Sequence, residues 1–213
     1  MIGGTGATGK QLLTQLISNQ NCDLVTSIGR RPALDGEKND KLVDVVVESL
    51  SNLSSTEKYW QDNDVFFNCI GTTRQRAGGA KEFINIESGI SNKAARMAMN
   101  ANIPHASLIS AKGANHKVWA KNWIHPLLYM KTIGQKEQTV TSNFIFNRVS
   151  IFRPGMLIRL QRKQTFFEIF FESRGLGLRV DTLALAMVHD AERVKLGLVE
   201  AVSYTHLRAH ETE

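Results

Sequence analysis

The sequence predicts an α/β fold in which a doubly wound parallel sheet carries helices on both faces. Three observations predict it. A glycine-rich loop stands at the start of the 213-residue chain, apolar residues recur at helical spacing directly after that loop, and strand patterns alternate with helix patterns along the rest. Such alternation is typical of parallel sheets, because a helix makes each crossover between parallel strands.

The glycine-rich loop places Gly3, Gly6 and Gly9 at three-residue intervals. Between a strand and a helix, such glycines allow a tight turn and let backbone N–H groups approach a pyrophosphate, since any Cβ would be in the way. The start of the following helix adds unpaired N–H groups and a partial positive charge. The loop therefore predicts a Rossmann-like NAD(P)-binding domain with these cofactor contacts: Gly3, Thr5, Gly6, Ala7, Thr8 and Gly9.

Both ends of the chain depart from this pattern. Only Met1 and Ile2 precede the first glycine, whereas a strand needs roughly five residues, so the first strand is expected to be truncated. Residues 202–213 resemble a translated adapter sequence and are expected to be a non-native tail. Residues 1–201 are expected to form a single NAD(P)-binding domain, because no linker or repeat divides them.

The predicted elements follow one another in alternation. After the loop, a helix with one buried face is predicted from the spacing of its apolar residues: Leu12, Leu13, Leu16 and Ile17. Strands are predicted over residues 24–28, 42–47, 64–70, 106–110 and 148–152. Helices are predicted over residues 80–100, 126–140 and 181–194. The run over 64–70 is almost continuously apolar, as in a parallel strand buried on both faces.

Composition limits the classes of function. A hydrophobic content of 42% and a charged content of 22% are ordinary for a soluble globular protein. We find no apolar run that could cross a bilayer, no nucleic-acid motif and no spacing of metal ligands. The net charge of +6 suits an anionic cofactor. Cys22 and Cys69 are far apart in the sequence and form no CxxC motif, which favours a reducing, cytoplasmic location.

The end of the second predicted strand distinguishes the two nicotinamide cofactors. In dinucleotide folds an acidic residue at this point holds the ribose 2′-hydroxyl of NAD, whereas arginine suits the 2′-phosphate of NADP. The chain has Arg30 and Arg31 here and no acid. We therefore predict NADP(H) as the cofactor, preferred over NAD(H).

Three further segments carry a family resemblance: Phe67 to Arg74, Ser110 to Ala114 and Ser150 to Gly155. They resemble the atypical short-chain dehydrogenase/reductases, in particular a group with fungal mitochondrial members. The similarity covers about residues 2–194. It implies a Rossmann-like fold, NADP(H) binding and possible mitochondrial association. It also implies cofactor contacts after the fourth and sixth strands, at Gly71, Thr72, Thr73, Arg153, Pro154 and Gly155.

The resemblance also implies a catalytic arrangement. Short-chain reductases use a serine, a tyrosine and a lysine, and the spacing Tyr-x-x-x-Lys puts the last two on one helix face. The lysine lowers the tyrosine pKa. Ser110 and Tyr129 match the serine and tyrosine positions, so they are the catalytic candidates. Position 133, however, is isoleucine where lysine is expected.

Three explanations fit Ile133: an error in the sequence at this position, replacement of the lysine by Lys112 or Lys136, or a protein that binds NADP(H) with little turnover. Two hypotheses of function follow. The leading one is an oxidoreductase that passes a hydride to a small carbonyl substrate. The alternative is an NADP(H)-sensing regulatory protein that acts through protein partners.

Overall fold

The computed structural model describes residues 1–121, 125–160, 177–198 and 202–205. The strands are β1 (Val25–Gly29), β2 (Leu42–Val46), β3 (Val65–Asn68), β4 (His105–Ile109), β5 (Arg148–Phe152), β6 (Met156–Ile158), β7 (Gly177–Arg179) and β8 (Val202–Thr205). The α-helices are α1 (Ala7–Ser18), α2 (Arg74–Ala77), α3 (Ala80–Ile84), α4 (Ser91–Asn100), α5 (His125–Ser142) and α7 (Val180–Lys195). The segment η3 (Asn85–Ile90), between α3 and α4, is π-helical. Two short 3₁₀ turns are η1 (Ala33–Gly36) and η2 (Ser54–Tyr59).

The main sheet is parallel throughout. Its two parts, β2–β1 and β3–β4–β5–β8, are joined by Ile2, which forms parallel bridges to Ile28 of β1 and to Asn68 of β3. The Ile2 N–H donates to the Phe67 carbonyl at 3.0 Å, and the Cys69 N–H donates to the Ile2 carbonyl at 3.1 Å. Met1 and Ile2 thus fill the place of a central strand, from which strands run out in both directions, as in a doubly wound fold.

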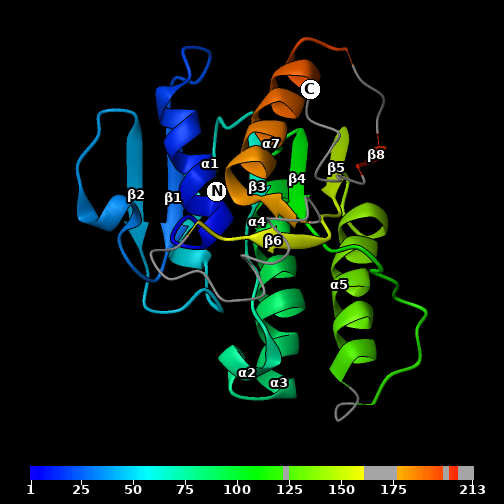
Figure 1. Ribbon diagram of the computed structural model, residues 1–213. Coiled ribbons are helices and arrows are strands. Elements are labelled where there is room, and N and C mark those ends of the chain that lie inside the picture. Colours follow the sequence, from blue (N-terminus) through cyan, green and yellow to red (C-terminus); the bar gives the residue numbers. More distant parts are fainter. Residues whose placement is uncertain (122–124, 161–176, 199–201, 206–213) are drawn as a thin grey trace.

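Helices cover both faces of this sheet (Figure 1). Buried residues of α1 and α7 form one hydrophobic core, and those of α4 and α5 form the other. Adjacent residues of β3 pack into different cores, since Phe66 lies in the core on the α4 side and Phe67 in the core on the α1 side. Both faces of β3 are therefore buried, which explains its continuous apolar pattern. The α/β, doubly wound fold predicted from the sequence is confirmed.

The elements differ from the predicted ones in detail. The predicted strands fall within two residues of their predicted ends, and the largest difference is at β3, which ends at Asn68 because the chain then turns into a loop. The structure is helical over residues 80–100, as predicted, but the middle part of this helix, η3, is π-helical. The structure adds the helix α2 and a separate two-stranded sheet of β6 and β7, whose three-residue strands are too short for a periodic pattern.

Residues 202–205 belong to the segment expected to be a non-native tail, yet the structure pairs them with β5 as the edge strand β8. The segment Val-Ser-Tyr-Thr is rich in residues that favour strands, and a sheet edge offers unpaired backbone groups to any such segment. The domain limit at residue 201 and the foreign origin of the tail stay predictions.

Candidate functional site at the carboxyl edge of the sheet

The glycine-rich loop connects Ile2 to α1 at the centre of the sheet. Gly3 has a φ of +80°, and a Cβ there would lie 2.6 Å from the Cys69 carbonyl carbon. A Cβ on Gly9 would lie 2.1 Å from the Gly3 oxygen. The protein's own packing therefore requires both glycines: the first for the turn, and the second for the close approach of α1 to the loop.

The N-terminus of α1 is open to an anion. Gly6 is its N-cap residue, no side chain caps it, and its first turn holds no acidic residue. Thr5 and Gly6 are exposed, whereas Thr8 is buried against the core. An exposed helix N-terminus of this kind offers N–H donors and a partial positive charge to a phosphate.

The loop after β3 lies against the glycine-rich loop, because Gly3 packs on the backbone of Cys69 and Ile70. A Cβ on Gly71 would meet nothing nearer than the Glu87 Oε1 atom at 3.9 Å, so the space beside it is open. The Thr72 N–H donates to the Glu87 carboxylate, and the Thr73 hydroxyl caps α2 by accepting from the Arg76 N–H. These two loops meet where the strand order reverses, which is where ligands bind in open α/β sheets.

The side chains of Arg30 and Arg31 are exposed at the end of β1. The turn that follows them is held by the Ala33 N–H, which donates to Asp44 Oδ2 at 2.8 Å. Lys10 of α1 reaches toward the same turn and forms an ion pair with Asp35 at 2.6 Å. This corner of the sheet, next to the glycine-rich loop, is thus solvent-accessible and presents Arg30 and Arg31 beside the Lys10–Asp35 ion pair.

A second group of predicted residues gathers on Glu137 of α5. Arg153, which follows β5, donates through Nε and Nη2 to the two oxygens of this carboxylate at 2.8 and 2.6 Å. The Ser110 hydroxyl, at the end of β4, donates to Oε1 of the same group. Glu137 is buried, and sequence reasoning missed it. The signal in the sequence that could have identified Glu137 is an acidic residue at a position where the helix pattern predicts a buried side chain.

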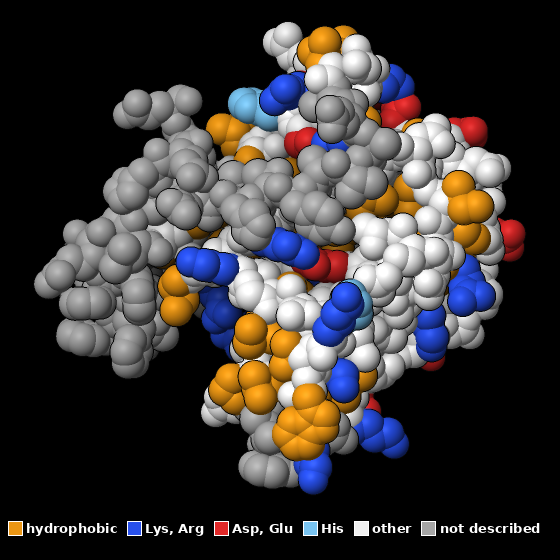
Figure 2. All heavy atoms as spheres, turned by 90° about the vertical axis from the view of Figure 1, so that its right-hand side faces the viewer, with side chains coloured by type: hydrophobic (Ala, Val, Ile, Leu, Met, Phe, Trp, Pro, Cys, Tyr) orange, Lys and Arg blue, Asp and Glu red, His pale blue; other side chains and the backbone are white. Residues whose placement is uncertain are grey.

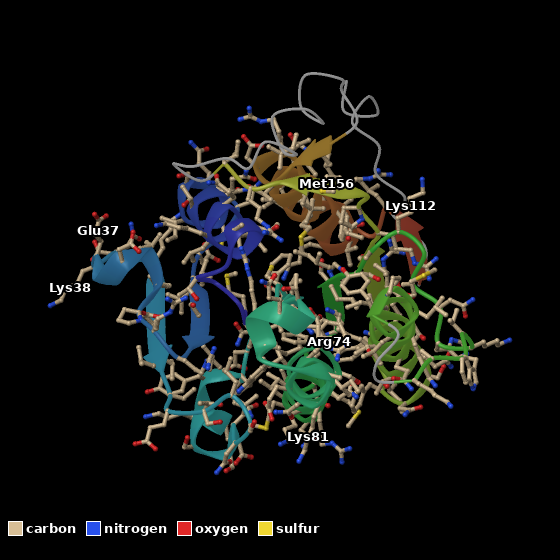
Figure 3. All side chains as sticks on the ribbon, turned by 60° about the horizontal axis from the view of Figure 1, so that its bottom comes forward. Glu37, Lys38, Arg74, Lys81, Lys112 and Met156 are labelled. Carbon is tan, nitrogen blue, oxygen red and sulfur yellow. The ribbon has the colours of Figure 1, made fainter. Side chains whose placement is uncertain are left out.

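Pro154 and Gly155 continue from Arg153 into the strand β6. The Pro154 carbonyl accepts the Lys112 N–H at 2.8 Å, which ties the loop after β5 to the loop after β4. Gly155 is exposed, and a Cβ there would meet no protein atom within 4 Å. Figure 3, which brings the lower edge of Figure 1 forward, labels Lys112 in the loop after β4, Met156 at the start of β6 and Arg74 at the start of α2.

Tyr129 lies near the start of α5, apart from this group. Its ring stacks on Phe83 of α3, with centroids 5.9 Å apart and planes 26° apart. Burial raises the pKa of Tyr129 to about 12, the charge of Glu87 adds to this, and Arg159 opposes it. The phenol is therefore protonated at neutral pH and can donate a proton, but it is a weak acid.

Position 133 holds a buried side chain, since Ile133 is 2% exposed. Of the two lysines considered as replacements, Lys112 is exposed in the loop after β4. Lys136 is 1% exposed, and its ammonium donates to the Ile70 carbonyl at 3.2 Å and contacts Glu87 Oε2 at 3.3 Å. The Lys136 charge is thus held beneath the loop after β3.

On the face shown in Figure 2, the described Lys and Arg side chains are scattered among polar and hydrophobic ones and form no continuous stripe. Within the part of the chain that the structure describes, no helix has the length and apolar character to cross a membrane, and no cluster of His, Cys, Asp and Glu could hold a metal ion.

The fold and the glycine-rich loop define a Rossmann-like, NAD(P)-binding type of domain. The chain belongs to the NAD(P)H-binding family, whose model matches residues 3–168. Its relatives include protein HTATIP2 of Rattus norvegicus, 32% identical over 158 residues, which cover 74% of this chain and 62% of that protein. The mitochondrial protein FMP52 of Meyerozyma guilliermondii is 31% identical over 170 residues, covering 79% and 68%. The family resemblance predicted from the sequence is thereby confirmed, and the chain spans about two thirds of these relatives.

Solved structures share the fold at low identity. The enzyme WbmH of Bordetella bronchiseptica, in complex with NAD⁺, has a TM-score of 0.71 and 14% identity, with 97% of this chain and 73% of that chain covered. The oxidoreductase ylbE of Lactococcus lactis has a TM-score of 0.65 and 15% identity, with 99% and 93% covered. These structures share the fold of the chain, and the family match shows an NAD(P)H-binding type of domain.

Proposed function

We propose that this chain is an NADP(H)-dependent oxidoreductase of the short-chain type that reduces a small carbonyl compound. One observation carries the proposal: the uncapped N-terminus of α1, with its glycine-rich loop, stands at the switch point of the sheet beside the exposed Arg30 and Arg31. This arrangement fits a dinucleotide whose pyrophosphate lies on the loop and whose 2′-phosphate lies at the end of β1.

The sheet order supports roles for the remaining candidates. Gly71, Thr72 and Thr73 follow β3, on the opposite side of the glycine-rich loop from β1, and Ser110 follows β4 beyond them. They would therefore border the nicotinamide half of the cofactor, together with the loop of Arg153, Pro154 and Gly155. When bound, the reduced cofactor supplies a hydride to the carbonyl carbon.

The protein's own residues would supply the proton and the orientation. Tyr129 is protonated at neutral pH, because its pKa is raised, and it would donate its proton to the carbonyl oxygen. The Ser110 hydroxyl donates its one hydrogen to Glu137, so in this arrangement its oxygen could only accept a hydrogen bond, from a donor group of the substrate other than the carbonyl. Arg153 holds Glu137 in place for that interaction.

A second candidate function is an NADP(H)-sensing regulatory protein with little turnover, acting through protein partners. The observation that favours it is Ile133, which stands where a lysine would lower the Tyr129 pKa, so that this pKa stays raised although Arg159 opposes the rise. We propose a cytoplasmic location, and the names of the fungal relatives favour mitochondrial association as an alternative.

Replacing Arg30 and Arg31 together by alanine is expected to weaken NADPH binding and to leave NADH binding unchanged. Loss of charge-assisted hydrogen bonds to the 2′-phosphate should raise the NADPH Kd by about 100-fold. Isothermal titration of both cofactors measures it, with Arg193→Ala, an exposed arginine near the far end of α7, as the matched control. An NADPH-to-NADH affinity ratio equal to that of the wild type would refute the cofactor assignment.

A further inference from the structure

A buried ion pair lies under the candidate site. The Lys136 ammonium and the Glu87 carboxylate are 3.3 Å apart, with their side chains 1% and 2% exposed. Removing two charges from water costs several kcal/mol for each ion. A folded protein with an apolar pair of similar size in their place is often equally stable. Stability alone therefore does not explain this pair.

The backbone is shaped to bring Glu87 inward. It lies in η3, the π-helical segment that interrupts the helix between α3 and α4. A π-helical turn holds an extra residue and so changes the direction of the side chains that follow, and such turns are frequent at functional sites. Glu87 is fully buried as a result and faces α5.

The pair holds both ends of one short loop. Lys136 donates to the Ile70 carbonyl at 3.2 Å, and Glu87 accepts the Thr72 N–H through its other oxygen. Between these two anchored residues stands Gly71, which is exposed and has open space where a Cβ would point. The pair thus fixes residues 70–72 from their buried side and leaves Gly71 exposed to solvent.

The same two helices also position Tyr129. Phe83, which stacks on Tyr129, precedes Glu87 by four residues, and Tyr129 precedes Lys136 by seven on α5. On α5 the spacing of seven puts Tyr129 and Lys136 on one helix face, two turns apart, and on the opposing helix Phe83 lies about one turn before Glu87. The ion pair and the aromatic stack are therefore two successive contacts between α5 and the α3–η3 helix.

The structure assigns a role to this pair: Lys136 and Glu87 are positioning residues that hold residues 70–72 as the floor for the nicotinamide half of NADP(H). This inference rests on the proposed function and deepens it. Lys136 acts through the loop, because its ammonium is buried against the Ile70 carbonyl and the Glu87 carboxylate. The pair also ties residues 70–72 to α5, the helix that carries Tyr129.

The test is the double variant Lys136→Met/Glu87→Leu in the full chain, which exchanges the pair for apolar side chains of similar volume. Two ligands are titrated: NADPH, and 2′-phospho-ADP-ribose, which has the same phosphates and no nicotinamide ring. We expect the NADPH Kd to rise by about tenfold, as for the loss of one well-placed interaction, and the 2′-phospho-ADP-ribose Kd to stay within about twofold. The matched control is Lys195→Met/Asp64→Leu, which removes an exposed ion pair at the protein surface.

Other outcomes overturn the inference. If both ligands lose affinity equally, or neither does, the pair has no selective effect on the nicotinamide half. Wild-type protein that binds neither ligand would show that the proposed function itself fails. If the double variant does not fold, Glu87→Gln keeps an oxygen for the Thr72 N–H and removes the charge. The inference then requires a smaller loss in the same direction, about threefold for NADPH alone.

Discussion

Replacing Gly9 by alanine is expected to abolish cofactor binding and to destabilise the protein. The added Cβ would lie 2.1 Å from the Gly3 oxygen, a distance that forces α1 away from the glycine-rich loop. Backbone overlap of this kind belongs to the most damaging class of substitution, so we expect a loss of about 3 kcal/mol or more in the free energy of unfolding. Urea denaturation measures the stability, and NADPH titration measures the binding.

Gly71→Ala is the matched comparison for Gly9→Ala. A Cβ on Gly71 would meet only Glu87, at an ordinary contact distance of 3.9 Å, so the fold should tolerate it. If the cofactor passes close to this residue, NADPH affinity falls while the unfolding free energy stays the same within about 0.5 kcal/mol. Stability that falls equally in both variants would contradict this division of roles between the two glycines.

Ile133→Lys is expected to raise carbonyl reduction by about 100-fold, the lower end of what positioned proton transfer contributes. A lysine four residues after Tyr129 lies on the same helix face, and its charge lowers the tyrosine pKa from about 12. Reduction needs the protonated phenol, so the rate falls as pH rises through the pKa. The falling limb of the pH–rate profile should therefore move to lower pH in the variant. NADPH consumption over a panel of small aldehydes and ketones measures both effects.

The control for this substitution is Ile133→Met, which keeps the size and adds no charge. Because Ile133 is buried, some stability should be lost with lysine, and the melting temperature must be followed in both variants. A folded Ile133→Lys protein that binds NADPH and gains no turnover would favour the regulatory function over the enzyme.

Local patterns predicted the fold because they depend on neighbours in the sequence. The apolar run before Ile70 predicted a strand buried on both faces, and the structure places β3 between the two cores. The spacing of Leu12, Leu13 and Leu16 predicted the buried face of α1. The glycine-rich loop predicted a truncated first strand before it, and the structure places Ile2 of that strand between β1 and β3.

The site was only partly predictable, since its side chains are organised by contacts between distant segments. Glu137 joins Ser110 and Arg153, and Glu87 joins Lys136 to the loop after β3, yet neither acid stands in a recognisable motif. The π-helical turn that buries Glu87 also leaves no mark in the apolar periodicity. Long-range pairs of this kind follow from the fold and do not appear in local spacing.

Titration of NADPH and NADH into the wild-type protein is the most direct test of cofactor binding at the carboxyl edge of the sheet. We expect one site that binds NADPH at least about tenfold more tightly than NADH, because the exposed Arg30 and Arg31 follow β1, where the 2′-phosphate would lie. Equal affinities would contradict the roles of Arg30 and Arg31. Binding of neither cofactor would contradict the central claim that this edge is a dinucleotide site.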